Sequence, residues 1–382
     1  MTERRAELDG AHDLGPLAAR VPEVLQRTAA YQVPVPPRVI AKLDANELPY
    51  GLPAELRAEL GRVLAEIALE RYPDAAARRL RAVVARQLSA ATPGTPGTPG
   101  TPGTPIGGDQ LVFGNGSDEL IAMLCSAFSA PRGGRPGAVL YPVPSFVYYK
   151  LAAIARGVGV VEVPLTETFE LDEPAMIRAI EEHHPSVVFL ALPNNPTGTL
   201  WRLGFATELA ARFRDVVIVS DEAYVIYSGA TSLPVLAGHP NLVVMRTLSK
   251  LGMAGLRVGY TVSSPAIAAL LEKLRPPYNV SALDQRAAEF LLEHAAEWCA
   301  ARAAEVVAER ARLAAALTAR GFEVFASEAN LVLVRTTGAA ALWQRLADAG
   351  VTVRLFDAGR LAGCLRITVG TPAENEALLA AL

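Results

Sequence analysis

Short runs of apolar, often β-branched residues alternate with helical stretches through the middle of the chain. Three such runs are Val187 to Leu192, Val216 to Val219 and Leu242 to Met245, and polar residues follow each one directly. Continuous apolar runs of this kind predict buried strands. Their alternation with helices is typical of an α/β fold with a mostly parallel sheet. Ligands of such sheets bind beyond the carboxyl ends of the strands, so the polar residues after these runs should meet at one site.

The same pattern predicts a large domain over residues 53–275 and a smaller α+β domain after it. A chain of 382 residues exceeds the size at which one core usually stops growing, so two domains are expected. Residues 282–320 are alanine-rich and predict a helical stretch, which begins after a break at Pro276 and Pro277. The tandem Pro-Gly-Thr repeat at 92–105 suits neither a helix nor a sheet centre, and we interpret it as a solvated loop.

Composition and charge exclude several classes of protein. The chain is 51% hydrophobic and 20% charged with a net charge of −3, so it lacks the basic surface that nucleic acids or anionic membranes require. No run approaches the roughly 18 apolar residues of a spanning helix, and the charged N-terminus does not fit a secretory signal. Cys125, Cys299 and Cys364 are few and far apart, which predicts reduced thiols in a cytoplasmic protein without a disulfide or metal site.

A lysine, Lys250, lies close behind the third apolar run. An ammonium group held away from water loses proton affinity, which makes its amine a competent nucleophile for a Schiff base. The second run leads into Asp221 and Tyr224, and the first leads into Asn195. This set fits pyridoxal phosphate better than any other cofactor, because that cofactor needs a lysine for its aldehyde, an anion at its ring nitrogen and donors at its phenolate oxygen. A surface lysine after a strand is the simpler alternative for Lys250.

Six segments in sequence order carry a resemblance to a known family. They are 43–47 (LDANE), 71–74 (RYPD), 114–119 (GNGSDE), 194–198 (NNPTG), 221–224 (DEAY) and 365–370 (LRITVG). With these motifs the chain resembles the fold-type-I aminotransferases that use pyridoxal phosphate, and within them the histidinol-phosphate aminotransferase family. The resemblance implies a seven-stranded, mostly parallel sheet in the large domain and a small domain built from residues 1–52 and 276–382. It also implies a homodimer.

The resemblance assigns roles around the cofactor ring. Lys250 would form the Schiff base, and Asp221 would pair with the pyridinium nitrogen. Tyr224 and Asn195 would donate to the phenolate oxygen. Phe146 matches the aromatic residue that stacks on the ring, although many relatives have tyrosine there. Taken alone, Asp221 also suits a helix N-cap, and Phe146 and Tyr224 also suit plain packing.

A composite phosphate site is expected at the start of a predicted helix. Gly116, Ser117 and Asp118 lie where free backbone N–H groups and the helix dipole would face an anion. Ser249 and Arg257 would add a hydroxyl and a guanidinium group suited to phosphate oxygens.

The remaining expectations concern the dimer and the substrate. Tyr72, which from sequence alone would be a turn residue, matches a residue that reaches across the family's dimer interface to the partner's cofactor phosphate. Arg366 should bind a carboxylate or phosphate of the substrate with its guanidinium fork. The other expected substrate contacts are Arg354, Tyr31, Asn46 and Asn330.

The implied activity is transfer of an amino group between glutamate/2-oxoglutarate and histidinol phosphate/imidazole acetol phosphate, in histidine biosynthesis. An aromatic amino acid aminotransferase is the main alternative. A phosphothreonine-type decarboxylase and a pyridoxal-phosphate-binding module without turnover are the others. The motif residues are expected to bind the cofactor and one anionic group of the substrate. They therefore do not identify the amino donor.

Overall fold

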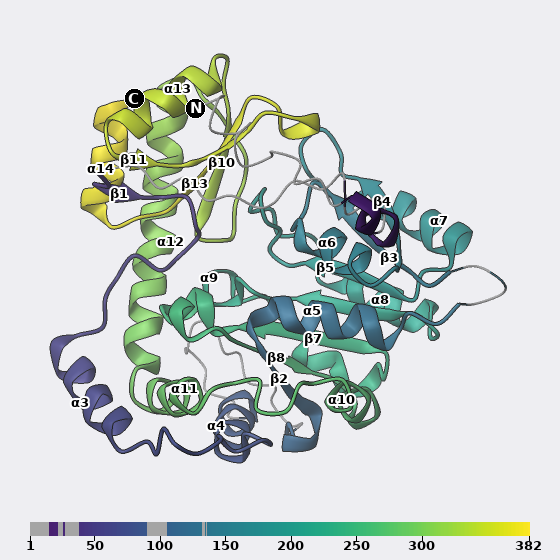
Figure 1. Cartoon of the computed structure of the whole chain (residues 1–382). Coiled ribbons are helices and arrows are strands. Elements are labelled where there is room, and N and C mark those ends of the chain that lie inside the picture. Colours follow the sequence, from purple (N-terminus) through teal and green to yellow (C-terminus); the bar gives the residue numbers. More distant parts are fainter. Residues whose placement is uncertain (1–14, 22–25, 27–37, 90–104, 132–133, 135) are drawn as a thin grey trace.

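A computed structural model describes residues 15–21, 26, 38–89, 105–131, 134 and 136–382. Its centre is a seven-stranded sheet (Figure 1). In spatial order the strands are β2 (Leu111–Asn115), β8 (Val258–Val262), β7 (Leu242–Thr247), β6 (Val217–Asp221), β5 (Val187–Ala191), β3 (Ala138–Val143) and β4 (Gly159–Pro164). Only β8 runs antiparallel to its neighbours. The expected mostly parallel sheet of seven strands is therefore confirmed.

Helices cover both faces of this sheet, which explains why its central strands are apolar along their whole length. The first face packs against α5 (Gly116–Ala127), α6 (Tyr148–Ile154) and α10 (Pro265–Glu272). The second packs against α7 (Glu173–His183) and α8 (Gly204–Arg212). Side chains alternate between the two cores along each strand, so that Val187 and Phe189 face the first core while Val188 and Leu190 face the second.

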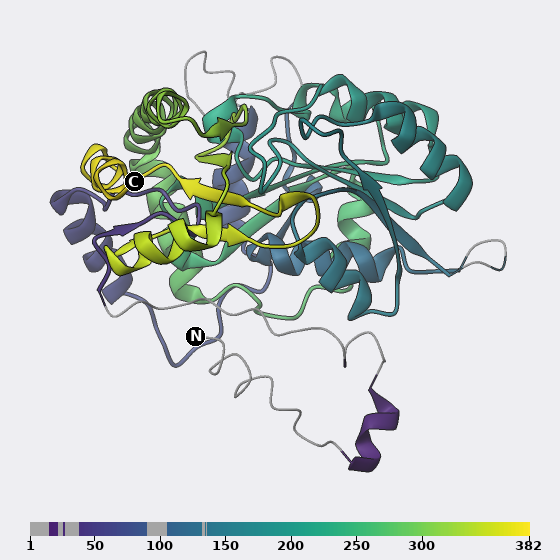
Figure 2. The same cartoon turned by 90° about the horizontal axis from the view of Figure 1, so that it is seen from above.

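Two smaller sheets lie beside the large one (Figures 1 and 2). One pairs β1 (Ala41–Lys42) with β11 (Val351–Thr352), and this pairing joins the N-terminal segment to the C-terminal region. The other has the order β12 (Arg354–Phe356), β13 (Cys364–Thr368), β10 (Leu331–Arg335) and β9 (Glu323–Val324). Two helices, α13 (Ala339–Asp348) and α14 (Pro372–Ala381), pack with these strands. The exact domain boundaries stay predictions.

The predicted helical stretch at 282–320 consists of two helices, α11 (Ala282–His294) and α12 (Ala296–Ala319). They are separated by Ala295, whose φ of −113° and ψ of 6° are not helical. No proline or glycine marks this break, so the sequence did not signal it. The two helices also pack differently. The first contacts α3 (Ala54–Ala65) and α4 (Arg78–Ser89), whereas α12 runs to the small sheets and α14 (Figure 1).

Two expectations lie outside the described residues. One is the substrate contact of Tyr31, and the other is the loop formed by the Pro-Gly-Thr repeat, of which the structure describes only the last proline, Pro105. Within the described ranges, no helix combines the length and the apolar character needed to cross a membrane.

Candidate active site

Three neighbouring strands bring the expected lysine, carboxylate and amide to one edge of the sheet. Asp221 is the last residue of β6, and Asn195 follows β5. Lys250 lies in a 3₁₀ turn (Leu248–Leu251) that begins directly after β7. Because β5, β6 and β7 pair side by side in parallel, their carboxyl ends share an edge. Lys250 also lies near Tyr224, with 5.6 Å between its Nζ and the ring centroid.

The amine of Lys250 is poised to lose its proton. Burial and, to a smaller extent, the charge of Arg366 lower the pKa of Lys250 to about 8, whereas the carboxylate of Glu47 opposes the shift. The backbone of the lysine is held by the hydroxyl of Tyr227, which donates to the carbonyl oxygen of Lys250 at 2.8 Å. A neutral amine near physiological pH is what nucleophilic attack on an aldehyde requires.

Asp221 is a buried anion without a cation beside it among the described residues. Only 5% of this residue is exposed to solvent. Tyr149 donates to its Oδ2 at 2.6 Å, and the backbone N–H of Ala223 donates to its Oδ1 at 3.2 Å. Burial raises the pKa of Asp221 to about 6, while the hydrogen bond from Tyr149 works in the opposite direction. An uncompensated buried carboxylate is costly, so this position fits a ligand that carries a positive charge.

The two expected donors, Tyr224 and Asn195, are each contacted by a residue from outside the large sheet. The Nδ2 of Asn46 donates to the Tyr224 hydroxyl at 2.9 Å. The Nη1 of Arg366, on β13, donates to Oδ1 of Asn195 at 2.8 Å. Burial raises the pKa of Tyr224, so its phenol keeps a proton to donate. Asn46 itself is pinned by Thr368, whose Oγ1 accepts from the Asn46 backbone N–H at 2.9 Å.

A second group of expected residues meets at the start of α5. Gly116 has a φ of +74°, and a Cβ there would lie 2.6 Å from Nη2 of Arg257. The same guanidinium group contacts Oγ of Ser249 and Oδ2 of Asp118, each at 3.4 Å. Ser117 is the second residue of the helix, and it lies against Gly259, where a Cβ would come within 2.7 Å of its backbone nitrogen. Because neither glycine has a side chain, the corner formed by Gly116 and Arg257 stays open at the N-terminus of α5. Such a corner suits a phosphate.

Phe146 and Tyr72 have different surroundings. Phe146 follows β3 and contacts Tyr149 edge-on, with ring centroids 5.7 Å apart. Tyr72 is 80% exposed and stacks on Tyr278 with centroids 4.6 Å apart. Within one chain, Tyr72 therefore has no contact with the residues around Lys250 in the described part of the structure.

The expected substrate residues are only partly brought together. Arg354 lies directly opposite Arg366 in the antiparallel pair of β12 and β13, so both side chains leave the same face of that sheet. Asn330 is fully buried, and its Nδ2 donates to the carbonyl oxygen of Glu47 at 3.2 Å. Asn330 thus supports the segment that carries Asn46, and its contact with substrate stays a prediction.

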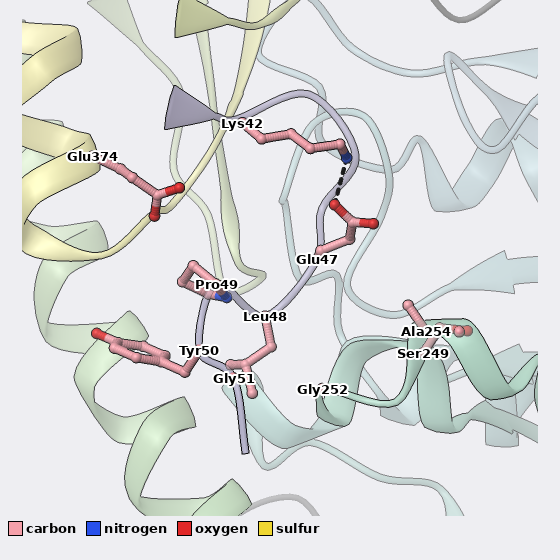
Figure 3. Close-up of a pocket in the computed structure, with 11 residues that line it drawn as sticks. Lys42, Glu47, Leu48, Pro49, Tyr50, Gly51, Ser249, Gly252, Ala254 and Glu374 are labelled. Carbon is pink, nitrogen blue, oxygen red and sulfur yellow. Dashed lines mark hydrogen bonds and ion pairs between the residues drawn. The ribbon is translucent and has the colours of Figure 1, made fainter. Parts of the chain in front are cut away.

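A pocket of about 310 Å³ lies between the N-terminal segment 42–51 and the turn after Lys250 (Figure 3). At its rim Lys42 and Glu47 form an ion pair with 2.5 Å between Nζ and Oε2. Leu48 lines the pocket and packs near Gly252. Of the residues expected to bind the cofactor, Ser249 alone contributes to this wall, so the pocket lies beside the candidate site.

Comparison with known proteins places the chain in a family. The model of the aminotransferases of class I and II matches residues 38–382. A histidinol-phosphate aminotransferase of Methylibium petroleiphilum is 44% identical over 380 residues, which cover 98% of this chain and 97% of the relative. Histidinol-phosphate aminotransferase 2 of Burkholderia pseudomallei is 46% identical over 358 residues, covering 91% and 94%. The chain belongs to the histidinol-phosphate aminotransferase family.

A solved structure agrees with the fold of this family. Histidinol-phosphate aminotransferase from Sinorhizobium meliloti, determined in complex with pyridoxal-5'-phosphate, superimposes with a TM-score of 0.78 at 23% identity. The superposition covers 95% of this chain and 96% of that one. The expectations of a fold-type-I architecture, of aminotransferase membership and of a pyridoxal phosphate cofactor are confirmed.

The residues of this chain fit that cofactor. Asp221 offers a buried anion for the ring nitrogen, and the corner at Gly116 and Arg257 offers donors and positive charge for the phosphate. The charge of Arg257 also acts on the amine of Lys250, so the lysine lies within reach of this corner. Sequence reasoning missed Tyr149 and the hydrogen bond of Asn46 to Tyr224, because neither contact joins residues that are close in the sequence.

We expect Gly116→Ala to weaken cofactor binding. The added methyl group would displace the Arg257 guanidinium, so the dissociation constant for pyridoxal phosphate should rise about tenfold or more. Titration of the apoenzyme, followed by visible absorption, measures this constant. Gly157→Ala is the matched control, because Gly157 also has a positive φ (+66°) but nothing lies within 4 Å of its added Cβ. Equal affinities for the two variants would contradict the assignment of Arg257.

The lowered pKa of Lys250 predicts how cofactor incorporation depends on pH. Only the neutral amine reacts, so the rate of incorporation into the apoenzyme should rise with pH, reach half its maximum near pH 8 and then level off. An ordinary lysine would continue to gain reactivity to about pH 10.4. Stopped-flow absorption measures the rate. The reaction of N-α-acetyllysine in the same buffers corrects for ionisation of the cofactor itself, and a rate that still climbs above about pH 10 would show that Lys250 is not perturbed.

Proposed function

We propose that this chain transfers an amino group between glutamate/2-oxoglutarate and histidinol phosphate/imidazole acetol phosphate, as a step of histidine biosynthesis. The relatives that match nearly its whole length carry the name of that aminotransferase. The structural observation that carries the proposal is the register that sets Arg354 opposite Arg366 on the same face of β12 and β13. Two guanidinium groups in that position suit a phosphorylated substrate.

The proposed roles around the cofactor follow from the contacts of each side chain. Pyridoxal phosphate, when bound, supplies an aldehyde for amines and a ring that takes up the electrons released at the substrate's Cα. The Nζ of Lys250 would hold the cofactor and, once free, would take the proton from the substrate's Cα and return it. Asp221 would stabilise the positive charge of the ring nitrogen. Tyr224 and Asn195 would donate to the phenolate oxygen, and Phe146 would pack against the ring.

The cofactor's phosphate would lie at the N-terminus of α5. The backbone N–H groups of Gly116 and Ser117 face it there, with Asp118 as a partner that orients Arg257. Ser249 adds a hydroxyl that already contacts the guanidinium group. These groups would hold the cofactor's phosphate.

Arg366 is proposed to bind the anionic group of either substrate. Glutamate offers an α-carboxylate, whereas histidinol phosphate offers a phosphate and no carboxylate, so one cationic site must accept both in turn. Arg366 already contacts Asn195 and the carbonyl oxygen of Asp44, which fixes its guanidinium group near the cofactor donors. Arg354 would add charge for the dianionic phosphate, with Tyr31, Asn46 and Asn330 as further expected contacts.

A cytoplasmic homodimer is part of the proposal. Tyr72 is exposed, and it stacks on another exposed ring, Tyr278, so the pair presents an aromatic surface to solvent. Such a surface suits a residue that completes the partner's site. The buried, unpaired thiols of the three cysteines accord with a reducing compartment.

The choice of amino donor can be tested with the wild-type enzyme and Arg354→Ala. We expect kcat/KM to be higher for histidinol phosphate than for phenylalanine. Arg354→Ala should raise the barrier for histidinol phosphate by about 1.5–3 kcal/mol, because a charge-assisted hydrogen bond is lost, and should affect glutamate less. Arg320→Ala, an exposed arginine at the end of α12, is the control. A wild-type preference for phenylalanine would replace this proposal with an aromatic amino acid aminotransferase.

Shared sites predict complementation between two inactive variants. When Lys250→Ala and Tyr72→Ala subunits are mixed equally, half of the dimers are hybrids and each hybrid has one intact site. Activity should therefore recover to about one quarter of the wild-type value. Lys250→Ala mixed with Asp221→Ala is the control and should stay inactive, because both residues belong to the same chain's site. No recovery despite confirmed subunit exchange, or a monomer by light scattering, would contradict the shared site.

A further inference from the structure

Tyr149, on α6, reaches the carboxylate of the candidate site with its hydroxyl group. Its hydroxyl donates to Oδ2 of Asp221 at 2.6 Å, and both side chains are buried. Within the part of the chain that the structure describes, this carboxylate is the hydroxyl's single hydrogen-bond partner. Burial raises the pKa of Tyr149 well above its ordinary value, so the hydroxyl stays protonated and acts as a donor.

The ring of Tyr149 is held by aromatic contacts that do not involve its hydroxyl. It stacks on Phe189 with centroids 4.6 Å apart and an interplanar angle of 10°. Phe146 meets it edge-on at 5.7 Å, and Tyr141 meets it at 5.6 Å. Packing therefore fixes the position of the ring, and the hydroxyl serves as a hydrogen-bond donor to Asp221.

The charges around Asp221 make that hydrogen bond important. The titratable groups that face Asp221 are the phenols of Tyr149 and Tyr224 and the carboxylates of Asp118 and Glu222. The negative charges of Asp118 and Glu222 both disfavour a negative charge on Asp221. The hydrogen bonds from Tyr149 and from the Ala223 backbone are thus the contacts that stabilise the anion.

We propose that Tyr149 is a positioning residue that keeps the proton shared by Asp221 and the cofactor on the cofactor's ring nitrogen. Donation from Tyr149 makes the carboxylate a weaker base, so the proton stays on nitrogen and is not drawn to the oxygen. Each carboxylate oxygen has two lone-pair positions, so the two existing hydrogen bonds leave room for the ring N–H. The inference rests on the cofactor site of the proposed function and is independent of the amino donor.

The test is Tyr149→Phe in the holoenzyme, reconstituted with pyridoxal phosphate that carries ¹⁵N in its ring. We expect the ring-nitrogen signal at neutral pH to move from the pyridinium position toward that of unprotonated pyridine. The kcat of amino transfer should fall by about tenfold or more, with KM changed by less than about threefold, because an interaction of the reacting state is lost. The signal is read without substrate, so this result does not depend on whether histidinol phosphate is the donor.

Tyr141→Phe is the matched control. It removes a hydroxyl from the same aromatic cluster, but that hydroxyl donates to Glu162 at 3.0 Å. Its ring-nitrogen signal should equal that of the wild type. If Tyr149→Phe does not fold, p-aminophenylalanine at position 149 keeps a weaker donor and should move the signal in the same direction by less. An unchanged signal in either protein substituted at position 149 would overturn the proposal.

Discussion

Because β5, β6 and β7 run parallel as neighbours in one sheet, the residues directly after them must emerge at a single edge. The pairing of these strands is what brings Asn195, Asp221 and Lys250 together, because the three residues are far apart in the sequence. The sheet fixes their spacing through backbone hydrogen bonds, and a shift of register by one residue would exchange the side chains that the two cores bury. The chemistry of the site therefore depends on strand pairing more than on any single side-chain contact.

The small sheets complete the site that the large sheet begins. Arg366 reaches Asn195, and Asn46 reaches Tyr224, so both donors expected at the phenolate oxygen are held by residues from outside the large sheet. Arg366 also lowers the pKa of Lys250, in addition to the larger effect of burial. One guanidinium group thus links the proposed place for the substrate's anion to the reactivity of the amine.

Much of this arrangement could be predicted from the sequence, for a physical reason. Apolar runs indicate burial, and the residues just after such a run in an α/β sheet lie at the ligand edge. Lys250 and Asp221 were therefore predicted from the pattern, and their placement agrees. The contact between Asn46 and Tyr224 joins residues 178 positions apart, and no local pattern encodes it. The break at Ala295 was missed because no proline or glycine marks it in this alanine-rich stretch.

The position of β13 near the end of the chain has a consequence for synthesis. It is the last strand to be made, and it supplies Arg366 to Asn195 and Thr368 to Asn46. The large sheet, with Lys250, Asp221 and the corner at Gly116, is complete well before it. Since chains begin to fold from the N-terminal side during translation, the nascent chain contains the proposed cofactor residues before it contains the arginine proposed to bind the substrate's anion. On the proposed roles, cofactor capture precedes the end of synthesis, while amino transfer waits for the final strand.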